Sequence, residues 1–167
     1  MDDETRIDAW KRLCELLDDD PELRADVRLA VADPDGYVDA HADALHTRGI
    51  ASPEDVDPWL VLIDGLDDAG ALAYMDRDDT GIELAEALSG VPRAIRSGVD
   101  LDEIGDVDGD LPAAIARADE LLAPSGLRLL YLQEEPDACP LVVVRASQAE
   151  DILSLAAELG RSARVFR

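Results

Sequence analysis

Apolar residues recur at helical spacing along the first part of the chain. The first predicted helix, residues 5–17, has one stripe made of Ile7, Trp10, Leu13, Cys14 and Leu17. A second helix is predicted to begin at Pro21, with Asp20 as its N-cap. It is expected to end at residues 33–34, where a proline follows an aspartate. A weaker helical pattern spans 37–45. The pattern therefore predicts three helices before residue 50.

A fourth helix carries Trp59, Leu62, Ile63 and Leu66 on its apolar face and ends near Gly70. Two starts are compatible with the sequence. One is the segment 52–55, and the other is Pro58 with Asp57 as the cap.

The pattern changes after Gly70. Residues 71–76 are short, apolar and bounded by glycine and charge, which predicts a strand. Thr80 and Glu83 have the spacing of a capping box, and the apolar residues of the helix they would open are Ile82, Leu84, Ala85 and Leu88. Residues 91–110 have little periodicity and are interpreted as an acidic loop with one helical turn at 92–96. A helix is expected from Pro112 to 122.

The C-terminal part predicts two strands at 127–132 and 141–145, joined as an antiparallel hairpin. Ser147 and Glu150 suggest a second capping box that opens a helix, and residues 163–166 suggest a final strand. We therefore expect one α+β domain over residues 1–167. Its N-terminal half is helical, and a small mixed β-sheet of about four strands, covered on one side by helices, ends in a strand-strand-helix-strand unit.

Periodicity also selects the residues expected in one hydrophobic core. These residues are Trp10, Leu13, Trp59, Leu62, Ile63, Leu66, Leu129, Val142, Val144, Ile152, Leu155 and Leu159.

The charge of the chain restricts its partners. With 39 acidic against 15 basic residues, the 167-residue chain has a formal net charge of −24. Such a surface argues against nucleic acid and anionic membranes, because binding phosphates needs clustered Lys and Arg. Two cysteines exclude a disulfide scaffold, no apolar run approaches ~20 residues, and the acidic N-terminus is unlike a signal peptide. A cytoplasmic protein is expected.

The carboxylates gather in two stretches, which form the candidate partner-binding face. The residues are Asp76, Asp78, Asp79, Asp100, Asp102, Glu103, Asp106, Asp108 and Asp110. Three interpretations stay open for the second stretch: a solvated loop, a weak divalent-ion site, and a docking surface for a basic partner. The spacing does not fit an EF-hand, since a loop starting at Asp106 would place Arg117 where the bidentate glutamate belongs.

Other candidate chemistry is sparse. His41 and His46 are five residues apart, so they do not share a helix face as a zinc pair would. Cys14 lies on an apolar stripe, and Cys139 has no adjacent base to activate it. No phosphate-binding, dinucleotide or hydrolase motif is present. We expect no catalytic residue, no metal and no cofactor.

Residues 58–76, PWLVLIDGLDDAGALAYMD, resemble an uncharacterised bacterial domain family of unknown function, and the strand pair and helix at 127–160 are similar to it as well. The resemblance implies a related fold and assigns no functional residue. In size, acidity and expected fold class the chain is also similar to bacterial immunity proteins, which neutralise toxins.

The leading hypothesis is a non-enzymatic acidic binding protein, most concretely an immunity or inhibitor protein that occludes a basic partner. One alternative is an uncharacterised enzyme that uses carboxylate acid–base chemistry. Another is an accessory domain whose acidity reflects the composition of its proteome, since the acids are mostly Asp and the bases almost all Arg.

Overall fold

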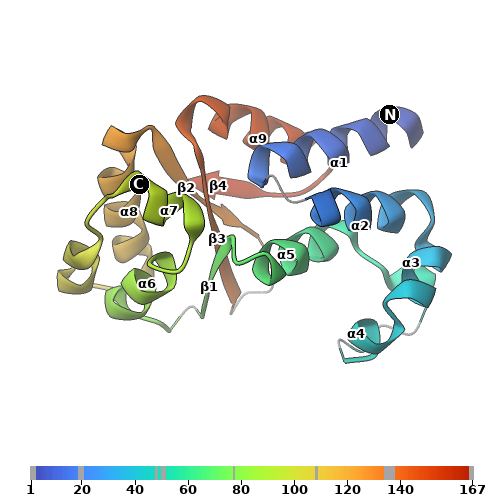
Figure 1. Cartoon of the computed structure of the whole chain (residues 1–167), viewed down its shortest axis with the longest axis horizontal. Helices are drawn as coiled ribbons and strands as arrows, with labels where there is room; N and C mark the ends of the chain where they lie inside the picture. Colours follow the sequence, from blue (N-terminus) through green and yellow to red (C-terminus); the bar gives the residue numbers. More distant parts are fainter. Residues whose placement is uncertain are drawn as a thin grey trace.

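The computed structural model describes residues 3–18, 21–47, 49, 52–76, 78–107, 109–133 and 138–165. In chain order the elements are α1 (Asp3–Leu17), α2 (Pro21–Ala32), α3 (Pro34–Ala40), α4 (Ala42–Thr47), η1 (Pro53–Asp55), α5 (Pro58–Asp68), β1 (Leu72–Asp76), α6 (Gly81–Leu88), α7 (Pro92–Ser97), η2 (Asp102–Asp106), α8 (Leu111–Leu122), η3 (Ala123–Ser125), β2 (Leu127–Leu132), β3 (Ala138–Arg145), α9 (Ala146–Glu158) and β4 (Ala163–Val165). The prediction of a helical first half followed by four strands is confirmed. Figure 1 shows the helices arranged around the sheet.

The sheet has the strand order β1-β3-β2-β4, and each neighbouring pair is antiparallel. The expected number of strands is confirmed, whereas the expected mixture of strand directions is not found. The helices that connect β1 to β2 do bring β2 back in the same direction as β1. However, β3 inserts between these two strands, so that no parallel pair is in contact.

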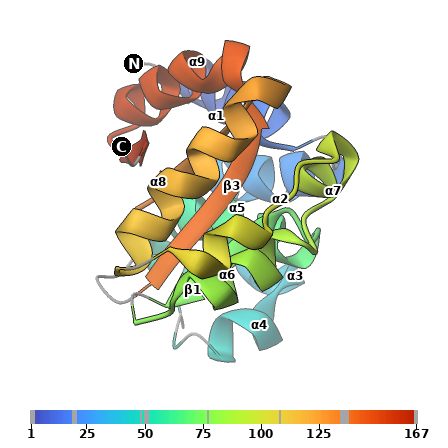
Figure 2. The ribbon, with the colours of Figure 1, turned by 90° about the vertical axis from the view of Figure 1, so that its left-hand side faces the viewer.

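Helices cover both faces of the sheet (Figure 2), so the expectation of a one-sided sheet is wrong. The strands explain this arrangement, because β3 is buried at every position from Cys139 to Val144. A strand that is apolar on both sides needs a cover on both sides. Helices α1, α5 and α9 pack on one face, and α2 packs across α1 and α5. Helices α6, α7 and α8 pack on the other face.

The two faces make two hydrophobic clusters rather than the single core expected. Nine of the twelve expected core residues are buried in the cluster on the α1, α5 and α9 side. Leu129 is buried in the other cluster because neighbouring residues of a strand point to opposite faces. Leu155 and Leu159 are only partly buried, although both pack against the first cluster.

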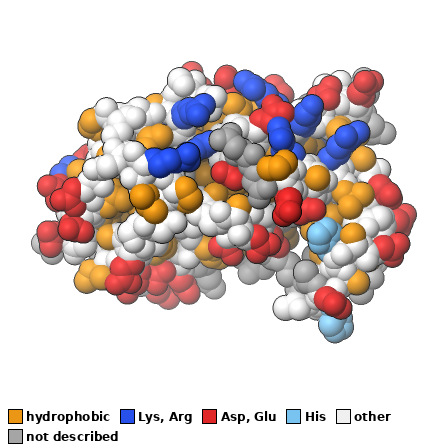
Figure 3. All heavy atoms as spheres, viewed as in Figure 1, with side chains coloured by type: hydrophobic (Ala, Val, Ile, Leu, Met, Phe, Trp, Pro, Cys, Tyr) orange, Lys and Arg blue, Asp and Glu red, His pale blue; other side chains and the backbone are white. Residues whose placement is uncertain are grey.

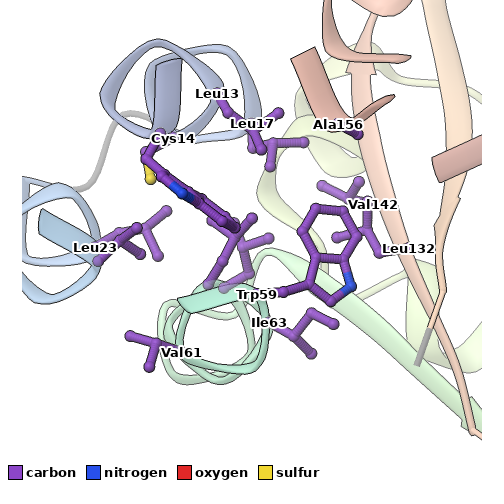
Figure 4. Packing of buried hydrophobic residues seen from close by; sticks show 14 of the residues in the cluster. Leu13, Cys14, Leu17, Leu23, Trp59, Val61, Ile63, Leu132, Val142 and Ala156 are labelled. Carbon is purple, nitrogen blue, oxygen red and sulfur yellow. The ribbon is translucent and has the colours of Figure 1, made fainter. Parts of the chain in front are cut away.

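Two tryptophans organise the first cluster. Trp59 of α5 lies between the strand residues Leu132 and Val142 and the α1 residues Leu13 and Leu17 (Figure 4). Its ring centroid is 6.4 Å from that of Trp10, at an interplanar angle of 59°. The Trp59 indole N–H donates a hydrogen bond to the Gln133 carbonyl oxygen at 2.7 Å. The α1–α5 packing is thereby tied to the end of β2.

The predicted helix starts have mixed outcomes. Asp57 is the N-cap of α5 and accepts a hydrogen bond from the Trp59 N–H at 3.0 Å, which favours the later of the two expected starts. The capping box of α6 is confirmed, with the Thr80 N–H donating to Glu83 Oε2 at 2.8 Å. The predicted capping box of Ser147 and Glu150 is wrong. Helix α9 starts directly after β3, and its N-cap is Arg145, whose side chain makes no capping hydrogen bond.

Residues 37–45 form two short helices instead of one, with a break at His41. The expected cap at Asp20 and the end of the last strand at Phe166 lie outside the described residues.

The stretch 91–110 is more ordered than the expected loop. It contains α7 and η2, and both Leu101 and Ile104 are buried in the second cluster. Two apolar residues in an acidic stretch are too few to produce a periodic signal, although they are enough to anchor the stretch on α6 and α8.

Candidate functional site

The two predicted acidic stretches lie together at one end of the molecule. The first stretch leads into α6, and the second contains η2, which packs on α6. The contact is close, since a Cβ added to Gly81 would collide with the Ile104 carbonyl oxygen. We call this region the acidic surface and define it by Asp76, Asp78, Asp79, Asp100, Asp102, Glu103, Asp106 and Asp110. Asp108, the ninth predicted residue, lies outside the described residues.

Four carboxylates of the acidic surface hold local backbone turns, including Asp76, which accepts a hydrogen bond from the Asp78 N–H at 3.4 Å. Asp79 accepts a hydrogen bond from the Asp76 N–H at 2.8 Å, Asp100 accepts one from the Asp102 N–H at 3.0 Å, and Asp110 caps α8 through the Ala113 N–H at 3.3 Å. These bonds give part of the acidity a structural role, because short polar side chains stabilise turns and helix starts.

Glu103 belongs to an ion-pair chain. Arg117 of α8 donates to Glu103 at 2.6 Å and to Glu120 at 2.9 Å. The hydrogen bonds that Arg117 donates to Glu120, and then to Glu103, raise the pKa of Arg117. This chain ties η2 to α8. It also leaves Glu103 less available to a partner than its neighbours.

Asp78, Asp102 and Asp106 are exposed, and no ion pair to them is found in the part of the chain that the structure describes. In the space-filling view acidic side chains lie along the lower left, over α6 and its surroundings, and further groups lie on the right, over α2 and α3 (Figure 3). Lys and Arg gather instead along the upper side, over α1, α2 and α9. Within the acidic surface these three aspartates are the exposed carboxylates that hold neither a backbone turn nor an ion pair among the described residues.

A second group of acids, which the sequence interpretation missed, lines a cavity of about 230 Å³ between α2, α3, α4 and α5. The side chains include Asp26, His41, Asp64, Asp67 and Asp68. His41 Nε2 is 3.4 Å from Asp26 Oδ1, and its ring stacks on Tyr37 with centroids 4.4 Å apart. Burial, followed by the charges of Asp68 and Asp64, raises the pKa of Asp67.

The signal for this second group was present in the sequence, since Asp64, Asp67 and Asp68 have helical spacing. Their approach to His41 and Asp26 depends on the packing of separate helices and could not be inferred from the pattern. His46 does not line this cavity and is exposed in the last turn of α4.

A cavity of about 480 Å³ lies where α5 begins and α9 ends. Its main polar feature is an ion pair that the sequence interpretation also missed: Arg161 donates to both carboxylate oxygens of Asp57, at 2.9 Å and 2.6 Å. Because Asp57 also caps α5, the pair fastens the turn before β4 to that helix. The partners are far apart in the chain, so no local pattern predicts the contact.

Both cysteines are buried and free. Burial raises the pKa of Cys14 to about 12 and that of Cys139 to about 11. Neither thiol is activated as a nucleophile would be.

Among the described residues no group of three His, Cys, Asp or Glu side chains is arranged to hold a metal ion. A search of the same residues finds no helix with the length and apolar character needed to cross a membrane.

The structure defines an α+β protein in which a four-stranded antiparallel sheet lies between two helical layers. A family model described as Domain of unknown function (DUF6630) matches residues 9–166, so the chain belongs to this family. The resemblance of residues 58–76 and 127–160 to an uncharacterised domain family is thereby confirmed. No curated protein and no solved structure matches the chain.

Proposed function

We propose that this protein is a non-enzymatic binding protein that docks its acidic surface on a basic surface of another protein. The observation that supports the proposal is the convergence of both acidic stretches on one rigid unit made of α6 and η2. Opposite charges raise the rate of encounter, and a preformed surface loses little conformational freedom on binding. The most concrete form is a bacterial immunity or inhibitor protein that covers the basic active site of its target.

The proposal assumes a reducing cytoplasm, with which two buried and unpaired thiols are compatible.

The test uses two variants that remove the same charge from different places. One replaces Asp78, Asp102 and Asp106 with Asn. The matched control replaces Asp35, Asp39 and Asp43, exposed aspartates of α3 and α4, with Asn. Proteins captured from a lysate at low salt are identified, and their association rates with both variants are measured at two ionic strengths.

A partner that uses the acidic surface should associate at least about threefold more slowly with the first variant, and its rate should depend less on salt. The control variant should stay close to wild type. Equal rates for the two variants would contradict the proposal, since they would show that only the total charge matters.

A second candidate function is an enzyme with carboxylate acid–base chemistry, and the observation that favours it is the cavity shared by His41, Asp26 and Asp67. A raised carboxyl pKa is typical of a general acid. Thermal melts with a panel of small metabolites test this alternative. A compound that stabilises wild type but not the Asp67→Asn variant would favour the enzyme over the binding protein.

A further inference from the structure

Ile82 is an exposed apolar residue within the acidic surface. Its side chain is 60% exposed, although it is the second residue of a helix whose Leu84 and Leu88 are fully buried. Leaving such a side chain in water forgoes part of the stabilisation that burying it would give.

The backbone around Ile82 is held firmly in place. The capping box formed by Thr80 and Glu83 fixes the first turn of α6, and its hydrogen bonds lower the pKa of Glu83. Gly81 lies directly against the Ile104 carbonyl, and a Cβ added to Gly105 would be 3.6 Å from Ile82 Cγ1. Ile82 therefore stands on a joint surface of α6 and η2 that is formed before any partner arrives.

Acidic residues belong to the same elements as this side chain. Glu83 follows it in α6, Asp78 precedes α6, and η2, which packs on α6, includes Asp102, Glu103 and Asp106. An apolar centre with a polar rim is the usual arrangement of a protein–protein contact surface, and the residues of the centre contribute most of the affinity.

We propose that Ile82 is the apolar anchor of the acidic surface and that the partner presents an apolar socket bordered by Lys and Arg. This inference rests on the proposed function and names the chemistry of the partner. Charge complementarity selects a basic surface. A basic partner surface without apolar side chains would leave Ile82 in water. Ile82 therefore adds affinity only where the partner also offers apolar surface.

The chain contains its own control. Ile95 of α7 is 59% exposed, which matches Ile82, but its neighbours within α7 are basic, Arg93 and Arg96. Replacing either isoleucine with Ser removes the same exposed apolar side chain. Only one of the two replacements lies within the acidic surface.

The experiment titrates two synthetic octapeptides of equal charge into the protein at low salt and follows the heat of binding. One peptide has six arginines with leucine at its third and sixth positions, and the other has glycine at those positions. Wild type should bind the leucine peptide roughly tenfold more tightly, the effect of partly burying one branched side chain. Ile82→Ser should abolish this difference, and Ile95→Ser should retain it.

The outcomes separate the anchor from the proposed function. If wild type binds both peptides equally, or if both Ser variants lose the difference alike, Ile82 is not the anchor. If neither peptide binds, or if the variant of Asp78, Asp102 and Asp106 binds both as tightly as wild type does, the acidic surface itself is not a docking site. Thermal melts of the two Ser variants should match wild type, because both side chains are exposed.

Discussion

At the scale of single residues, the two tryptophans differ in the hydrogen bonding of their indole groups. Both are buried in the same cluster and lie in contact. Trp59 donates its N–H to Gln133, whereas no partner for Trp10 Nε1 is found among the described residues. Buried polar groups contribute favourably only when they are paired. The two positions should therefore respond differently to the same substitution.

We expect Trp59→Phe to be more destabilising than Trp10→Phe by about 1–2 kcal/mol. The first change removes a hydrogen bond and leaves the Gln133 carbonyl without its donor. The change at Trp10 removes a buried N–H group that has no partner among the described residues, so no hydrogen bond is lost and the cost of desolvating this group disappears. Urea unfolding of both variants measures the difference, and equal free energies of unfolding would show that Trp10 has a partner of similar strength.

The cysteines give a residue-scale prediction about pH. Because burial raises both thiol pKa values above 9.0, to about 12 and 11, the folded protein holds these protons longer than the unfolded chain does. Stability from this source is complete below about pH 9 and is lost as the pH rises toward the folded pKa values. Urea melts should therefore show lower stability at pH 10 than at pH 8.

The control is the double variant Cys14→Ala and Cys139→Ala, whose stability should fall less over the same interval. A thiol reagent at pH 8 should modify neither cysteine in the folded protein and both in denaturant. Rapid modification of the folded protein would contradict the burial of the thiols.

At the scale of elements, one carboxylate joins α8 to β2. Asp119 accepts hydrogen bonds from Arg128 Nε at 2.9 Å and Nη2 at 3.0 Å, and from the Leu129 N–H at 2.9 Å. Among the described residues Asp119 is the one charged residue that is buried. Its bond to a strand N–H positions β2 along α8, so the pair aligns two elements.

Asp119→Ala should destabilise the fold by about 3 kcal/mol or more, because it leaves a partly buried guanidinium without its counter-ion and a strand N–H without its acceptor. Glu120→Ala is the matched control. Glu120 is the next residue of α8, but its side chain is 68% exposed, so losing its ion pair with Arg117 should have little effect. Chemical denaturation measures the free energy of unfolding of both variants. Equal losses of stability would show that Asp119 is as solvated as Glu120 and would contradict the prediction.

At the scale of the whole molecule, the sequence predicts the elements better than their assembly. Helical stripes and short apolar runs identify α1, α2, α5, β1 and β2 because these signals are local. The insertion of β3 between β1 and β2 depends on packing, and so does the cover on both faces of the sheet. The same limit applies to the sites. The acidic stretches are visible in the sequence, while the Asp57–Arg161 pair and the cavity at His41 join residues from separate helices and turns.

The position of β3 also has a consequence for synthesis of the protein. A chain leaves the ribosome N-terminus first, and β1 and β2 emerge before β3, the strand that pairs with both. A nascent chain that stops before Ala138 therefore contains two apolar strands that lack their common neighbour. Unpaired apolar edges promote aggregation. We therefore expect the nascent protein to be most prone to aggregation until β3 (Ala138–Arg145) has left the ribosome.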